Sequence, residues 1–175
     1  MRKMLFAATG LTAVVVATLS FLSHVPAHAQ SGSRFEPTLA PDPYEVKLWK
    51  WLQAAKYRNW APVPGKSGDF YPGESPHGAF LKMYLNRTAA GSPKELPAGS
   101  VLIKENYTAN KQLAAVTVMY KTKGYHAAAA DWYWVKFNPD GSAARKGDVK
   151  LAGKVKGCID CHGDAEGNDW AFFND

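Results

Sequence analysis

The chain has 175 residues, a formal net charge of +6 and 46% hydrophobic residues, which is enough apolar material for one well-packed core. The basic excess is small and the lysines are scattered without long clusters. This charge pattern excludes the basic footprint of a nucleic-acid-binding protein and indicates an ordinary solvated surface.

An apolar run near the N-terminus has the order of a secretory signal peptide. Arg2 and Lys3 precede the apolar stretch 4–22, and the small-x-small sequence 27–29 follows it. The stretch approaches the length of about 20 residues that a spanning helix needs, so an uncleaved membrane anchor is the alternative. The Ala-x-Ala site favours cleavage. We therefore predict a signal peptide at 1–29, export to the periplasm, and no stable membrane insertion after cleavage.

One helix is predicted after the signal segment. Residues 30–41 are polar and contain proline, which indicates a flexible leader. Asp42 followed by Pro43 is a helix-start pair, and apolar residues then recur at helical spacing, which predicts a helix over 43–56. The segment 57–76 is rich in proline, glycine and aromatic residues and indicates an irregular loop. We expect this loop to pack through Trp60, Phe70 and Tyr71.

Four strands are predicted after Gly78. Each run is short, rich in β-branched or aromatic residues, and bounded by turn residues. The four runs are 79–86, 100–107, 113–121 and 131–138. The chain is therefore predicted to be α+β, a mainly antiparallel β-sheet with an N-terminal helix and a C-terminal loop that carries the cysteines. This domain is expected to span 42–175.

The two cysteines of the chain both lie in the sequence Cys158-Ile159-Asp160-Cys161-His162. This is the C-x-x-C-H signature of c-type haem attachment. The spacing lets two sulfurs form thioethers with the two vinyl groups of one haem, and the adjacent histidine then serves as the proximal iron ligand. We predict one covalent haem c held by Cys158 and Cys161, with His162 on the iron.

Three other interpretations of the motif fit less well. A zinc site needs four ligands, commonly two C-x-x-C pairs, and no second pair exists in the sequence. A thioredoxin-like dithiol is expected at a helix start within a βαβ unit, whereas this motif follows predicted antiparallel strands. A structural disulfide suits an exported protein but gives no reason for His162.

The position of the motif bears on the sixth iron ligand. Only 13 residues follow His162, and none of them is Met, His or Lys, so a sixth ligand would come from upstream. The candidates are His77, Met83, Lys104, Met119 and His126. Each of these also has an ordinary explanation as a core or surface residue. A vacant sixth position is the other alternative, and it would let the iron bind a small molecule.

The chain resembles the cytochrome P-460 family, which includes the cytochromes c′-beta. The resemblance rests on the C-terminal C-x-x-C-H motif with its short aromatic tail and on a β-rich segment before it. The matching stretches are 77–78, 83–86, 97–105, 119–121, 131–134, 157–162 and 168–173. The resemblance implies an antiparallel sheet with helices, a homodimer, and a five-coordinate haem with His162 as proximal ligand.

The resemblance also implies a role for Lys104. In hydroxylamine-oxidising members a lysine in the matching strand is crosslinked to the haem ring. An amine shielded from water near the ring would have a lowered pKa and raised nucleophilicity. Strand alternation alone does not place Lys104 at the haem, because a strand lysine is most often solvent-facing and both predicted faces are mixed. One face carries Leu102, Lys104 and Asn106, and the other carries Val101, Ile103, Glu105 and Tyr107. The aromatic tail residues Trp170, Phe172 and Phe173 are expected to form either the haem wall or core packing.

Three functions remain open from the sequence. The first is a periplasmic oxidoreductase that oxidises hydroxylamine or a related nitrogen oxide and passes electrons to a soluble acceptor. Such an enzyme also needs a carboxylate near the substrate, and Asp148, the one acid between Asp140 and Cys158, does not align clearly with the family's acid. The second is a cytochrome c′-beta-like protein that binds nitric oxide without turnover, with Lys104 not crosslinked. The third is a simple electron carrier with a sixth ligand from Met83, Met119 or His77.

Overall fold

The computed structural model describes residues 44–165, 167 and 169–173. The predicted signal peptide at 1–29, the leader at 30–41 and the helix-start pair Asp42 and Pro43 lie outside these residues. All described residues belong to one compact unit. Within the described part, no helix is long and apolar enough to cross a membrane.

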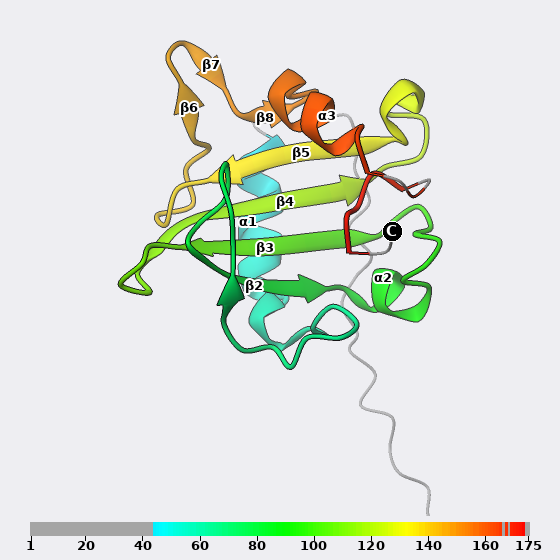
Figure 1. Cartoon of the computed structure of the whole chain (residues 1–175). Coiled ribbons are helices and arrows are strands. Elements are labelled where there is room, and N and C mark those ends of the chain that lie inside the picture. Colours follow the sequence, from blue (N-terminus) through cyan, green and yellow to red (C-terminus); the bar gives the residue numbers. More distant parts are fainter. Residues whose placement is uncertain (1–43, 166, 168, 174–175) are drawn as a thin grey trace, which may run out of the picture. The chain divides into compact units, whose positions relative to one another are not determined.

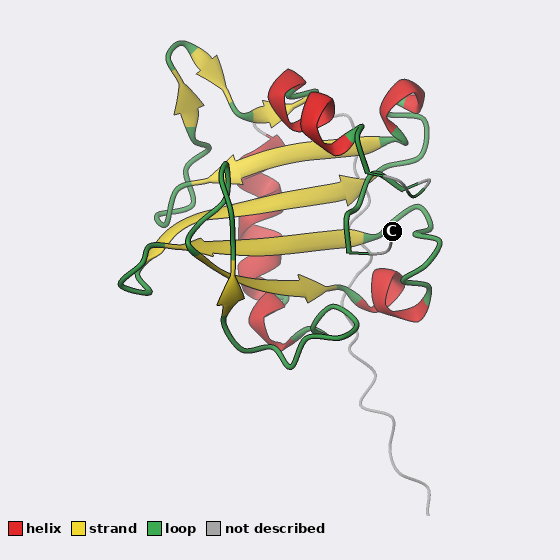
Figure 2. Cartoon of the chain, in the orientation of Figure 1, coloured by secondary structure: helices red, strands yellow, loops and turns green. Residues whose placement is uncertain are grey.

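A six-stranded antiparallel sheet forms the centre of the fold (Figures 1 and 2). Its strands, in spatial order, are β1 (Tyr71–Pro72), β2 (Phe80–Leu85), β3 (Val101–Tyr107), β4 (Leu113–Lys121), β5 (Trp132–Phe137) and β8 (Ala152–Gly153). The strands β6 (Arg145–Lys146) and β7 (Val149–Lys150) form a separate hairpin. The four long strands confirm the four predicted strands. They form there because β-branched and aromatic residues suit a pleated, half-buried surface. The two-residue strands were not predicted, since segments this short show no alternation.

The helices are α1 (Tyr44–Ala54), α2 (Arg87–Gly91) and α3 (Lys156–His162), with the 3₁₀ turns η1 (Tyr57–Asn59) and η2 (Ala127–Ala129). The helix α1 confirms the predicted N-terminal helix, and its Leu48 and Leu52 are fully buried. The short helix α2 was not predicted. Its N-terminus is capped by Asn86, whose Oδ1 accepts a hydrogen bond from the Ala89 amide at 3.0 Å.

The two faces of the sheet belong to two different cores. Figure 1 shows α1 behind the sheet and α3 with the C-terminal tail in front of it. Side chains of Val101 and Ile103 pack with α1 in one cluster, while Leu102 packs with the tail residue Ala171 in the other. The predicted alternation along β3 is therefore confirmed, since successive strand residues point to opposite faces. We call these the α1 face and the pocket face.

The C-x-x-C-H motif lies in a helix and not in the predicted loop. Cys158 and Cys161 both belong to α3, and the amides of Cys158 and Ile159 donate to the Val155 carbonyl at 3.0 Å. The prediction of a loop was wrong here because seven residues are too few to display a helical apolar pattern. Val155 is buried and Cys158 and Ile159 pack on the pocket-face core, so tertiary contacts stabilise this short helix.

Candidate functional site

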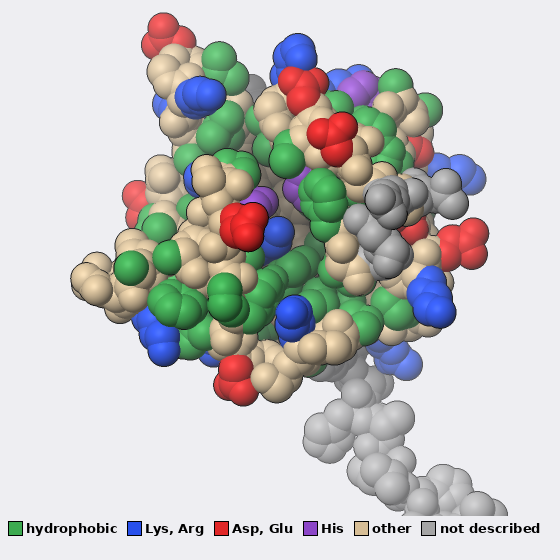
Figure 3. Space-filling model, viewed as in Figure 1, with side chains coloured by type: hydrophobic (Ala, Val, Ile, Leu, Met, Phe, Trp, Pro, Cys, Tyr) green, Lys and Arg blue, Asp and Glu red, His purple; other side chains and the backbone are tan. Residues whose placement is uncertain are grey.

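A cavity of about 410 Å³ opens on the pocket face of the sheet. Figure 3 shows it as a hollow with a largely hydrophobic floor and with histidine and basic side chains at its margin. Strands β2 to β5 form the floor, and α3, the tail and the loop before β2 form the walls. The floor side chains are Leu81, Met83, Leu102, Thr117, Met119 and Trp134. Such an apolar cavity with a few polar groups is typical of a cofactor site.

His162 ends α3 and lines this cavity. Its Nδ1 lies 2.8 Å from the Trp170 carbonyl oxygen, which can only accept a hydrogen bond, so Nδ1 donates and Nε2 carries the free lone pair. Burial lowers the pKa of His162, with a further lowering from nearby Lys104 that the Trp170 carbonyl opposes. The ring packs between Trp134, at 4.8 Å between centroids, and Phe172, at 5.3 Å. The side chain is thus a neutral, oriented imidazole, the form that binds a metal ion.

Asp169 holds the tail that carries the Trp170 carbonyl. Its side chain is 7% exposed and forms an ion pair with Lys121. It also accepts a hydrogen bond from the Leu96 amide at 2.7 Å. Its carbonyl accepts a hydrogen bond from Trp132 Nε1 at 2.7 Å. We call this set of contacts the Asp169 clamp. It fixes the tail against β4 and β5 and thereby the orientation of His162.

The two cysteines are free thiols on α3. Cys158 lines the cavity, and Cys161 is exposed outside its lining. Positions three apart lie on the same side of a helix, so both sulfurs can reach one group at the cavity margin. Burial raises the pKa of the Cys158 thiol, although the charge of Lys136 opposes this. Both thiols therefore precede His162 in the same short helix.

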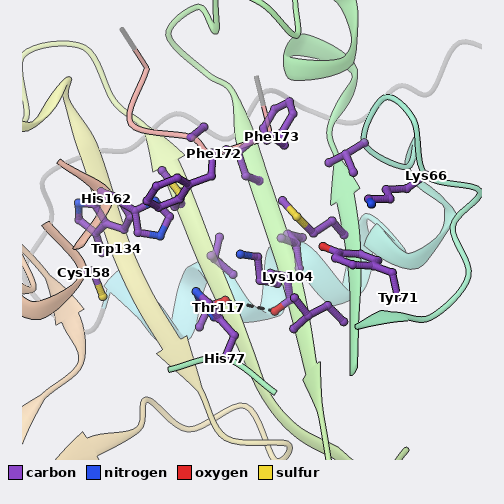
Figure 4. A pocket seen from close by; sticks show the side chains of 18 of the residues that line it. Lys66, Tyr71, His77, Lys104, Thr117, Trp134, Cys158, His162, Phe172 and Phe173 are labelled. Atoms are coloured by element: carbon purple, nitrogen blue, oxygen red, sulfur yellow. Dashed lines mark hydrogen bonds between the residues drawn. The ribbon is translucent and has the colours of Figure 1, made fainter. Parts of the chain in front are cut away.

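Lys104 projects from the middle of β3 into the same cavity (Figure 4). Its cross-strand neighbours are Met83 on β2 and Thr117 on β4. Within the described part of the chain, the amine forms no hydrogen bond and no ion pair. Burial lowers the pKa of Lys104, and a weaker influence of Cys161 opposes this. Burial therefore shifts the protonation equilibrium of Lys104 toward the neutral amine, which is the nucleophilic form.

His77 enters the cavity from the loop between β1 and β2. Its Nδ1 lies 3.0 Å from Asn106 Oδ1. The pKa of His77 is lowered to about 4, mainly by burial and then by the Lys104 charge, although the Asn106 hydrogen bond opposes this. A side chain at Gly78 would collide with the Tyr107 backbone, so glycine lets the loop approach β3 closely enough for His77 to reach Asn106.

Some of the other predicted residues line the cavity and some do not. Phe172 and Phe173 line the cavity, as do Met83 and Met119. The Trp170 side chain is not among the lining residues, and its contribution is the carbonyl that holds His162. His126 precedes η2 and does not line the cavity. Asp148 is exposed in the turn of the β6–β7 hairpin, and no Asp or Glu is found among the described lining residues.

Two residues of the site had no role in the sequence analysis. Asn106 orients His77, and Trp134 packs on His162. The indole Nε1 of Trp134 is buried and has no acceptor among the described residues. A buried donor without a partner is costly, so a bound group that supplied an acceptor to this nitrogen would remove that cost. Nothing in the local sequence marks either residue, because both act across strands.

A comparison with protein families shows which family this chain belongs to. The family Cytochrome P460 matches residues 54–173, a segment that contains every cavity-lining residue named above. The chain belongs to the cytochrome P460 family. Membership implies a haem-binding cytochrome, as the resemblance predicted. No curated protein matches the sequence.

The residues of this cytochrome P460 family member fit a haem. The cavity is apolar and of a size for a flat cofactor, His162 presents a free Nε2, and Cys158 brings a thiol to the margin. An iron porphyrin needs an axial nitrogen with a fixed second-shell partner, and the Trp170 carbonyl provides that partner. The unpaired Trp134 donor also suits a group with carboxylate oxygens.

Proposed function

We propose that the cavity holds one haem c, attached to this exported protein through thioethers from Cys158 and Cys161 and bound at its iron by His162 Nε2. In each thioether an S–H adds across a vinyl group, so no atom is lost. The proposal is supported by the C-x-x-C-H spacing on α3, by the free Nε2 of His162 and by the apolar cavity beside them. The bound haem would supply a redox-active iron that can bind small nitrogen compounds.

We further propose that the protein oxidises hydroxylamine or a related nitrogen oxide. One observation carries this proposal: the desolvated amine of Lys104 lies in the same cavity as His162 and Cys158. In this proposal the amine bonds to the haem ring. Joining its nitrogen to a ring carbon removes a hydrogen from each, so the bond needs an oxidant, which we take to be dioxygen or a peroxide. Such a crosslink would alter the electronics of the ring and with them the iron's reactivity.

The proposed oxidation needs a side chain in the cavity that accepts protons from hydroxylamine. Oxidation of hydroxylamine releases protons together with electrons, and a base near the substrate speeds this step. Since no carboxylate lies among the described lining residues, the neutral imidazole of His77 is the available acceptor. The electrons would pass to a soluble acceptor.

The crosslink is tested by mass spectrometry of the protein matured in a host that attaches c-type haem. The expected result is a single haem on both the peptide 158–162 and the Lys104 peptide, with hydroxylamine-dependent reduction of a dye acceptor. Lys104→Met should keep the haem on the cysteines and lose turnover. Lys82→Met is the matched control, because Lys82 lies on the neighbouring strand with its amine over the Phe70 ring. Haem on the cysteine peptide alone would contradict the oxidase proposal. A colourless protein with both thiols free would contradict the proposal of bound haem as well.

Binding of nitric oxide without turnover is the second candidate. It is favoured by the lack of any carboxylate among the described lining residues, because the pocket then has no carboxylate to serve as general base in substrate oxidation. The same experiment separates the two. A spectrum that responds to nitric oxide, combined with haem on the cysteine peptide alone and no hydroxylamine turnover, supports this candidate.

A further inference from the structure

A tight turn forms part of one cavity wall. In the sequence Val63-Pro64-Gly65-Lys66 the Lys66 amide donates to the Val63 carbonyl at 3.1 Å, and Gly65 has a φ of 77°. Proline at the second position and a glycine with positive φ at the third are the signature of a type II turn. Val63 is buried and lines the cavity together with Pro64. The turn is therefore anchored in the fold, and it fixes the point from which Lys66 extends.

The side chain of Lys66 leaves this turn toward the cavity. Its amine lies 4.9 Å from the centroid of the Tyr71 ring, which is a cation–π contact. Figure 4 shows the Lys66 amine and the Tyr71 hydroxyl directed into the cavity from the side away from His162. Both residues line the cavity, and Lys66 is exposed whereas Tyr71 is partly buried. The two side chains thus lie where the cavity meets solvent, and we call them the mouth pair.

Neither member of the mouth pair has an acceptor within the described part of the chain. The Lys66 amine forms no hydrogen bond or ion pair there, and the Tyr71 hydroxyl forms no hydrogen bond there. Burial raises the pKa of Tyr71 to about 12, so its hydroxyl keeps its proton and can donate. An ammonium group and a phenol O–H are therefore available to one acceptor that enters the cavity.

The charges that line the cavity have one sign. Lys66 and Lys104 are the basic residues among the described lining side chains, and no Asp or Glu occurs with them. The pKa of His77 is lowered to about 4, mainly by burial and then by the Lys104 charge, so a further positive charge is disfavoured here. A cleft lined by charge of one sign raises the local concentration of ions of the opposite sign. The cavity should therefore favour small anions over uncharged molecules of the same size.

We propose that the mouth pair selects small anions, with the Lys66 amine and the Tyr71 hydroxyl donating to the anionic end of a molecule that enters the cavity. This inference rests on the proposed function, because it takes the haem iron to be reachable from this cavity. It adds a preference among the nitrogen compounds that the iron can meet. Hydroxylamine is uncharged near neutral pH and gains little from the pair. An oxidised product such as nitrite is an anion and is held.

The selection is tested with azide, an anion that binds ferric haem, and carbon monoxide, an uncharged ligand of ferrous haem. In the haem-loaded protein Lys66→Gln should raise the Kd for azide by about three- to tenfold, because one positive charge near the ligand is lost. The rate of carbon monoxide binding should not change. Lys66→Arg should retain azide affinity, since the charge is kept. Tyr71→Phe should weaken azide binding by less than Lys66→Gln does, because it removes a neutral donor.

Lys82→Gln is the matched control. It removes the same charge from the neighbouring strand, where the Lys82 amine lies over the Phe70 ring and outside the cavity lining. Its azide affinity should equal that of the wild type. Added salt should weaken azide binding to the wild type more than to Lys66→Gln, because the Lys66 amine is exposed and open to screening.

The outcomes separate this inference from the proposed function. An azide Kd that is unchanged in Lys66→Gln contradicts the inference, and so does an equal loss in Lys82→Gln. Parallel losses of azide and carbon monoxide binding also contradict it, because Lys66 would then only shape the cavity. A protein that oxidises hydroxylamine with such an azide result keeps the proposed function and loses the inference. One that selects azide through Lys66 but never oxidises hydroxylamine loses the proposed oxidation alone, and a protein without haem contradicts both.

Discussion

Two neighbouring residues of β3 show how differently the two faces of the sheet treat a charge. Glu105 on the α1 face is fully buried. It accepts hydrogen bonds from the hydroxyls of Tyr57 at 2.8 Å, Tyr84 at 3.1 Å and Tyr107 at 2.5 Å, and from Arg58 Nε at 2.7 Å. Lys104 on the pocket face has no such partner among the described residues. The Glu105 carboxylate is thus hydrogen-bonded on both oxygens by the protein itself. The Lys104 amine is removed from water without gaining a partner among the described residues.

This difference separates a part of the protein built for stability from a part built for chemistry. Buried polar groups that are fully bonded hold a core in one arrangement. A buried amine without a partner does not stabilise the fold, and perturbed groups of this kind gather at functional sites. The α1 face should therefore dominate unfolding measurements, and the pocket face should dominate spectra and reactivity.

The largest effect is expected from Glu105→Leu. The change leaves Arg58 and three tyrosine hydroxyls without their acceptor. Because the Arg58 side chain is half exposed, most of the loss comes from the hydroxyls, at about 1–3 kcal/mol for each buried polar group left unpaired. Urea unfolding of the haem-loaded protein measures the loss. The haem spectrum of the variant that remains folded should be unchanged, because Glu105 faces away from the cavity. A loss below about 1 kcal/mol would contradict the role given to the α1 face.

A smaller loss is expected from Asp169→Ala in the clamp. The Leu96 amide and Lys121 lose a charged acceptor, which costs about 1.5–3 kcal/mol. Unlike Glu105→Leu, this change should also disturb the haem spectrum, because the clamp positions the Trp170 carbonyl that orients His162. Asp164→Ala is the control, since Asp164 is exposed in the same part of the chain. A destabilised protein with an unaltered spectrum would show that the clamp does not act on His162.

Acid should weaken the α1 face through Glu105. Burial by itself would raise the pKa of this carboxyl, but hydrogen bonds from Tyr107 and Tyr57 and the Arg58 charge outweigh burial and lower it below 4.5. The unfolded chain therefore binds the proton first, so the free energy of unfolding decreases as the pH falls below about 4.5 toward the lowered pKa. Urea midpoints measured from pH 6 to pH 3 (roughly the range in which carboxyls titrate) should fall less steeply in Glu105→Gln. Equal slopes of the urea midpoint against pH in the two proteins would contradict this explanation.

The smallest effect on stability is expected from Lys104→Met. Methionine keeps the length and apolar stem of lysine and removes a desolvated amine that has no partner, so the free energy of unfolding should change by less than about 1 kcal/mol or rise. The comparison is made in a Cys158→Ala, Cys161→Ala background, where neither thioether nor crosslink contributes. A loss as large as that of Glu105→Leu would mean that the amine has a structural partner and that the two faces do not differ as described.

Local pattern accounts for the elements that the sequence predicted correctly. The helix over 43–56 and the four long strands follow from apolar periodicity, which one segment displays by itself. The haem motif is equally local, because Cys158, Cys161 and His162 need only their spacing to be recognised. Short elements such as α2, α3 and β8 were missed, since they are stabilised by packing against neighbours and too short to show a period.

The sequence by itself determined the α+β class, the alternation of β3 and the residues of the haem motif, because these depend on neighbours along the chain. Only the tertiary structure decided that Lys104 enters the cavity, that Asn106 orients His77, and that Asp169 holds the carbonyl behind His162. Each of these depends on side chains that meet across strands or from distant segments. Such meetings are set by strand register and by the path of the loops, which no single stretch of sequence specifies.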